Sequence, residues 1–281
     1  MAEITMEKIK ELRERTGVAV NKCKEALTEV GGDMEKAVDL LRKSGMASAV
    51  KKAGREANEG KIGVAETADA IAIVEVNAET DFVVNNEKFQ KFVQEIAEEI
   101  AKTKPANLEQ FLAQKFSKDS TLSVDEYRAT LVQAIGENIQ ISRFTLLPKK
   151  KGHSVAVYSH LGGKIVTSVD IAGSDGKESL SRDIAMHVAA ASPEYLNANA
   201  VPAEILEREK DIAKEQIKGK PENIVEKIVE GKMKAFYDMA CLVNQKYIKD
   251  DSLSVEEFVK QHGGKDLTVS SFLRWTVGQK Q

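Results

Sequence analysis

The chain has 281 residues, of which 42% are hydrophobic and 30% are charged, and its formal net charge is −3. This length fits two or three folded domains, and the near-zero net charge argues against a dominant nucleic-acid surface, which usually carries clustered Lys and Arg. No apolar run reaches the roughly 18 residues of a membrane span, the first residues mix acids and bases, and the two cysteines form no disulfide framework. These features predict a soluble cytoplasmic protein that binds neither nucleic acid nor membranes.

The N-terminal residues predict a small domain of three helices. Apolar residues recur at helical spacing after the N-cap candidate Thr5, after the break at Gly17, and after the N-cap candidate Asp33. The third helix is expected to end near Ser44 and Gly45. We therefore expect a domain over residues 1–46, followed by a polar linker over 47–60 that is partly helical.

Residues 61–147 change to the alternating pattern of strands. The segments KIGVAE and AIAIVEVN predict an antiparallel pair, and a strongly amphipathic helix follows up to Pro105. A further helix begins with Ser123 three residues before Glu126, which is the arrangement of a capping box. We interpret this region as a first α+β subdomain.

A second round of strands and helix occupies residues 148–281, after the strand QISRFTLL that introduces it. The strands SVAVYSH and KIVTSVDIA are joined by a turn at residues 162–164. Two related α+β subdomains are therefore predicted, without detectable identity between them. Residues 202–243 predict an antiparallel helical hairpin broken once, at 219–221. The sequence leaves two roles open for this hairpin, self-association and simple packing on the rest of the protein.

Sequence signatures of catalysis are missing. Each Gly-Lys pair lacks the other residues of a phosphate-binding loop. The segment GHSVA, with Ser154, resembles a nucleophile elbow but is followed by a strand where the elbow needs a helix. The histidines have no metal-ligand spacing. We predict no catalytic residue, no metal ligand and no cofactor, so contact with a partner is the expected activity.

Phe82 poses a separate question, because it lies in a polar connection between a strand and a helix. A hydrophobic staple against the helix that follows would bury it, and on residue type alone this is the favoured interpretation. The alternative is a side chain that is displayed to a partner. Asp81 is either a cap of the same helix or an acceptor for partner groups.

Six segments in order resemble the translation elongation factor Ts family. They are TGVAVNKCKEAL (16–27), VNAETDFV (76–83), IGENI (135–139), HLGGKI (160–165), MHVAA (186–190) and GKPENI (219–224). The resemblance implies a ubiquitin-associated type of N-terminal domain, a core of two α+β subdomains, and an inserted hairpin that is used for homodimerisation.

The resemblance also implies an activity and its residues. The family promotes nucleotide exchange on elongation factor Tu, the GTPase that delivers aminoacyl-tRNA, and binds it both with GDP and without nucleotide. The Phe of the motif enters the GTPase and disturbs its Mg²⁺, which assigns partner binding to Thr80, Asp81, Phe82 and Val83. Further contacts are expected at Thr16, Gly17, Lys24 and His160. The alternative function is an adaptor whose three-helix domain holds helical or ubiquitin-like partners.

Overall fold

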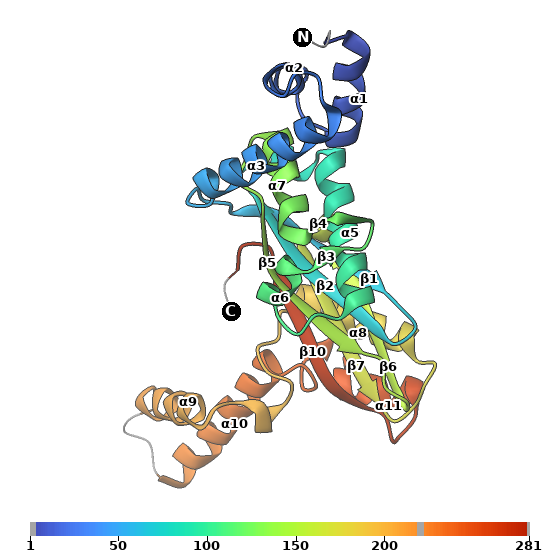
Figure 1. The fold of residues 1–281 in the computed structure, drawn as a ribbon. Helices are drawn as coiled ribbons and strands as arrows, with labels where there is room; N and C mark the ends of the chain where they lie inside the picture. The colour runs from blue at the N-terminus through green and yellow to red at the C-terminus, as the bar shows by residue number, and fades with distance from the viewer. Residues whose placement is uncertain (1–3, 218–221, 280–281) are drawn as a thin grey trace. The chain divides into compact units, whose positions relative to one another are not determined.

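The computed structural model describes residues 4–217 and 222–279, which form two compact units (Figure 1). The first unit contains the residues up to Pro148 together with those from Val277 onward, and the second runs from Lys149 to Thr276. The elements of the first unit are α1 (Met6–Thr16), α2 (Val20–Glu29), α3 (Met34–Lys52), β1 (Glu59–Glu66), β2 (Ala70–Ala78), α4 (Asp81–Val84), α5 (Glu87–Thr103), α6 (Leu108–Ala113), β3 (Lys115–Phe116), β4 (Asp119–Ser123), α7 (Val124–Ile135) and β5 (Gln140–Pro148). Those of the second unit are β6 (His153–His160), η1 (Leu161–Gly163), β7 (Ile165–Ala172), α8 (Glu178–Ala191), η2 (Ala198–Ala200), α9 (Ala203–Glu215), α10 (Glu222–Ala240), β8 (Lys246–Tyr247), β9 (Asp250–Ser254), α11 (Val255–Gly263) and β10 (Thr268–Thr276).

The three predicted N-terminal helices are confirmed, together with the N-caps predicted for the first and the third. The Thr5 hydroxyl accepts a hydrogen bond from the amide of Lys8, and the Asp33 carboxylate accepts one from the amide of Lys36. Gly17 ends α1 in the left-handed conformation, at a φ of 68°. The apolar faces of the three helices meet in a core of their own, which includes the buried Leu12 and Leu27.

The end predicted for the third helix is wrong, because α3 continues through Ser44 and Gly45 to Lys52. Helix α3 packs against α7 (Figure 1). Gly45 is buried within α3. A Cβ atom at this position would lie 3.3 Å from the carbonyl oxygen of Ala129 in α7. The glycine therefore allows a close approach of two helices instead of ending one of them.

The first unit is built on a three-stranded antiparallel sheet in the order β1-β2-β5. Every residue of β2 is buried, and α5 packs along β1 and β2. The predicted pair of β1 and β2 is confirmed, with Lys61 opposite Val76. The strand predicted to introduce the second round, β5, belongs to this first sheet and pairs with β2. The residue pattern of β5 does not decide which sheet it joins, because a strand of this composition fits the edge of either sheet.

The second unit has a three-stranded antiparallel sheet in the order β10-β7-β6, with α8 packed against β6 and β7. The predicted turn between β6 and β7 is confirmed, since His160 pairs with Ile165 across it. Helices α9 and α10 pack against each other, as expected for a helical hairpin. The turn predicted at 219–221 lies outside the described residues.

A short module occurs once in each unit and was missed by the sequence analysis. Residues 114–127 read QKFSKDSTLSVDEY, and residues 245–258 read QKYIKDDSLSVEEF, so identity between the halves is detectable after all. Each segment forms two short antiparallel strands and then a helix with a capping box, at Ser123 and at Ser254. Both units therefore have the same order of hairpin, helix, module and final strand. Overall, three helices are followed by small antiparallel sheets with helices, which confirms a mixed α+β fold.

Candidate functional site

Phe82 lies in α4, a single helical turn between the end of β2 and the start of α5. It is 83% exposed, whereas the two residues that follow, Val83 and Val84, are buried and hold the turn on the unit. The hydroxyl of Thr80 accepts a hydrogen bond from the amide of Val83 at 3.4 Å and so caps the turn. The residue at the cap is thus Thr80 and not Asp81, which is the first residue of the turn and is exposed. A staple or core role for Phe82 is excluded, because its side chain is in solvent.

The turn is fastened to the loop that follows α7. The amide and the hydroxyl of Thr80 both donate to the carboxylate of Glu137, at 3.1 and 2.7 Å. In return, the amide of Asn138 donates to the carboxylate of Glu79 at 2.6 Å, and the Arg55 guanidinium donates to the same oxygen at 3.3 Å. The IGENI motif contains Glu137 and Asn138, but their sequence distance from Thr80 gave no signal that they meet.

The predicted loop at Thr16 and Gly17 lies at the same end of α5 as the turn of Phe82. The Lys88 ammonium, in the first turn of α5, donates to the carbonyl oxygen of Gly17 at 3.3 Å. The hydroxyl of Thr16 donates to the carbonyl of Leu12 at 2.7 Å and so closes the last turn of α1. The structure thereby brings together the two regions of the first unit that the resemblance assigns to the partner.

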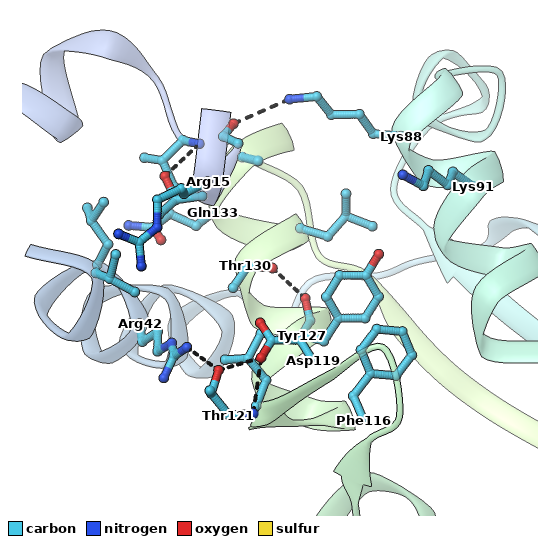
Figure 2. A pocket seen from close by; sticks show the side chains of 18 of the residues that line it. Arg15, Arg42, Lys88, Lys91, Phe116, Asp119, Thr121, Tyr127, Thr130 and Gln133 are labelled. Carbon is cyan, nitrogen blue, oxygen red and sulfur yellow. Dashed lines mark hydrogen bonds between the residues drawn. The ribbon is translucent and has the colours of Figure 1, made fainter. Parts of the chain in front are cut away.

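A pocket of about 520 Å³ lies between the N-terminal helices and the body of the first unit (Figure 2). Four cationic side chains line it, namely those of Arg15, Arg42, Lys88 and Lys91. Arg15 is paired with Glu35 at 2.9 Å, and Arg42 donates to the hydroxyl of Thr121 at 2.5 Å. Arg15 therefore joins α1 to α3, and Arg42 joins α3 to β4 of the body. The pocket was not predicted from the sequence.

Lys24 and His160 are the other predicted contacts. Lys24 is exposed on α2. His160 ends β6 in the second unit, and its Nδ1 atom lies 3.1 Å from the hydroxyl of Tyr158. The next residue, Leu161, is 68% exposed and has a φ of 48°, which is uncommon for a residue other than glycine. Leu161 is therefore displayed to solvent, whereas His160 beside it is half-buried.

In the described part of the chain, side chains suited to nucleophilic or metal-assisted catalysis do not lie together. Ser154 is fully buried, its hydroxyl donates to the Ser174 carbonyl at 2.9 Å, and the amide of Lys177 donates to it. A nucleophile must be reachable, so the nucleophile-elbow alternative is excluded. Within residues 4–217 and 222–279, no group of three His, Cys, Asp or Glu side chains could hold a metal ion.

His187, which the sequence places among apolar residues of a helix, is buried and satisfied. The amide of Ile248 donates to its Nδ1 atom at 3.2 Å, so Nε2 carries the proton and donates to Gln245 at 2.9 Å. Burial lowers the pKa of His187, because the charged form would lose its hydration. This histidine is a structural residue of the second unit.

Comparison with known proteins agrees with this geometry. None of the helices in the described residues is both long and apolar enough to cross a membrane. The family model "Elongation factor TS" matches residues 79–279. The chain is 62% identical to elongation factor Ts of Protochlamydia amoebophila, over 99% of this chain and 100% of that protein. It is 44% identical to elongation factor Ts of Chlamydia pneumoniae and 43% identical to that of Chlamydia caviae, over the same shares. With a family match over most of its length and full-length relatives at these identities, this chain belongs to the elongation factor Ts family.

Proposed function

We propose that this chain releases GDP from elongation factor Tu by inserting Phe82 beside the nucleotide and disturbing the bound Mg²⁺. The family is the nucleotide exchange factor of elongation factor Tu in translation elongation, and it is not an enzyme. The observation that carries the proposal is the 83% exposure of Phe82 in a turn that is held from both sides. Aromatic side chains, Phe among them, are enriched in the cores of protein interfaces, so a Phe displayed on a held turn is a candidate anchor for a partner.

The physical basis is the charge of the bound nucleotide. In a GTPase, Mg²⁺ and the amides at a helix start neutralise the GDP phosphates, so moving either one leaves phosphate charge uncompensated. Each reduction of about 1.4 kcal/mol in the release barrier speeds release about tenfold. By linkage, GDP and the exchange factor weaken each other's binding to elongation factor Tu to the same extent. This reciprocity lets the complex cycle, because GTP can in turn displace the exchange factor.

The roles within the turn follow from its contacts. Phe82 is the inserted side chain, and Asp81 is exposed beside it as an acceptor for donor groups of the partner. Thr80 and Val83 shape the turn, through the cap and through burial. Around this centre, we expect Thr16, Gly17 and Lys24 to contact elongation factor Tu from the N-terminal helices. His160, with the exposed Leu161, is a separate contact from the second unit.

The remaining features of the family belong to the same proposal. The N-terminal helices are of the ubiquitin-associated type, and the recurring module favours two α+β subdomains that arose by duplication. Packing of α9 on α10 produces a helical hairpin over residues 202–243 that is available for homodimerisation. Translation takes place in the cytoplasm, so this is the expected location.

The test is release of a fluorescent GDP analogue from elongation factor Tu, with and without this chain. We expect release to become faster with increasing concentration of the chain and to saturate. Release in the presence of the chain should slow as Mg²⁺ is raised, because the ion and Phe82 act on the same site in opposite directions. Binding without faster release would instead support the adaptor function and contradict the proposal.

A further inference from the structure

We propose that Glu137 is a positioning residue for nucleotide exchange, which holds the turn of Phe82 in its displayed shape. The inference rests on the proposed function of Phe82 and extends it to a residue of the IGENI motif. The two segments involved, 79–80 and 137–138, are far apart in the sequence and each gives a carboxylate to a backbone amide of the other. Because the contacts are reciprocal, neither segment can move away without breaking bonds of both.

The hydroxyl of Thr80 explains why Glu137 acts on Phe82. A hydroxyl has one proton to donate and two lone pairs to accept with. Thr80 donates its proton to Glu137 at 2.7 Å, which leaves the lone pairs for the amide of Val83 at 3.4 Å. Glu137 thus selects the orientation in which Thr80 caps α4. Hydrogen bonds to a charged carboxylate are the stronger kind, so this selection is firm.

The turn needs such support because it cannot hold itself. α4 is four residues long, far below the length at which a helix is stable alone. Phe82 contributes little packing, since it is in solvent, and only Val83 and Val84 anchor the turn from the inside. Glu137 anchors it from the outside. A side chain that is already in place loses less entropy when it enters the partner, so its binding is stronger.

The loop that carries Glu137 is shaped for this contact. Gly136 ends α7 with a φ of 94°, a left-handed conformation that glycine adopts without strain, and it lets the chain reverse directly after the helix. Asn138 then lies 1% exposed and donates from its side chain to the carbonyl of Arg55 at 2.8 Å. Glu137 is therefore presented to Thr80 by a loop that is itself fixed on the body.

The central variant is Glu137→Gln, which keeps the shape but replaces one acceptor oxygen by a donor. Either the amide or the hydroxyl of Thr80 then loses its acceptor, and we expect the maximal rate of GDP release to fall roughly tenfold. The matched control is Glu257→Gln, which also removes a carboxylate that accepts from a backbone amide, that of Ser254 at 2.7 Å, but in the second unit. This control should exchange at the normal rate.

Combination with Phe82→Ala separates positioning from general destabilisation. If Glu137 acts only through Phe82, adding Glu137→Gln to Phe82→Ala should cause no further slowing of release. Hydrogen–deuterium exchange of residues 79–86 in the free protein should also become faster in Glu137→Gln. A pair of variants at Thr80 gives an independent check: Thr80→Val loses the proton donated to Glu137 and should behave like Glu137→Gln, whereas Thr80→Ser keeps it and should behave like the wild type.

The outcomes distinguish the two proposals. Normal release with Phe82→Ala would overturn the proposed function and with it the role of Glu137. Slow release with Phe82→Ala but normal release with Glu137→Gln would overturn only the role of Glu137. The role of Glu137 alone would also be overturned if Glu137→Gln slows release equally in the wild type and in Phe82→Ala. It would likewise be overturned if Glu137→Gln leaves the hydrogen exchange of residues 79–86 unchanged. If Glu137→Gln does not fold, equal release by Thr80→Val and Thr80→Ser overturns the inference.

Discussion

Replacing Phe82 by alanine separates a displayed side chain from a core residue, because the two predict opposite effects. Burying a Phe side chain fully contributes about 1.5–3 kcal/mol. Phe82 is 83% exposed, so less than a fifth of this, at most about 0.5 kcal/mol, is realised in the free protein. We therefore expect the free energy of unfolding of Phe82→Ala to be close to that of the wild type.

The effect on exchange should be much larger than the effect on stability. The rest of this burial free energy, about 1.2–2.5 kcal/mol, is gained only when Phe82 is buried against elongation factor Tu. If it is gained as GDP leaves, its loss slows release by about 8- to 70-fold at saturating exchange factor. The assay is release of a fluorescent GDP analogue, at several concentrations of Mg²⁺. Raising Mg²⁺ should inhibit the wild type more than the variant, because only the wild type acts against the ion.

The matched control is Phe89→Ala, on the buried face of α5. Phe89 is completely buried in the core of the first unit, so its truncation should lower the free energy of unfolding by about 3–5 kcal/mol. Urea denaturation of the two variants therefore compares a displayed and a buried Phe seven residues apart in the sequence. The reasoning is refuted if Phe82→Ala is destabilised as strongly as Phe89→Ala, yet releases GDP normally when folded.

Three further predictions concern other parts of the chain. Lys24→Glu reverses an exposed charge on α2 and should slow association with elongation factor Tu, most strongly at low salt, without changing stability; equal association rates in stopped-flow mixing would remove Lys24 from the contact. The lowered pKa of His187 means that the unfolded chain takes up a proton below about pH 6.5 while the folded chain does not, so stability is full above this pH and falls by at most about 1.4 kcal/mol per pH unit below it. Urea denaturation between pH 7.5 and 5.5 should accordingly show a smaller decline for His187→Gln than for the wild type, and an equal decline would contradict this. Sedimentation of the chain at about tens of micromolar, a range typical of weak dimers, should show a dimer formed by residues 202–243, and a strictly monomeric species would remove that proposal.

Much of the local structure could be predicted because its causes are local. The capping box at Ser123 needs only a serine and a glutamate three residues apart, and the amphipathic face of α5 is visible as a repeat of apolar residues. The first two strands were predicted by their alternation and their short separation. The motif around Thr80 was also visible, and with five other segments in order it indicated the family before any geometry was known.

Other features depend on contacts between residues that are distant in the sequence. The pattern around Gly45 is that of a helix end, and only the packing of α3 on α7 shows why a glycine continues the helix there. The pattern of β5 does not state which sheet it joins. Residue type alone favoured a buried Phe82, because a Phe in front of a helix is more often packed than displayed.

The tertiary structure decided these points for one physical reason. Burial and hydrogen bonding are properties of the assembled neighbourhood, and a sequence pattern reports only the neighbours within a few residues. Phe82 is exposed while its neighbours Val83 and Val84 are buried in the core of the first unit. Thr80 has its proton acceptor in Glu137, which folding alone brings within 2.7 Å.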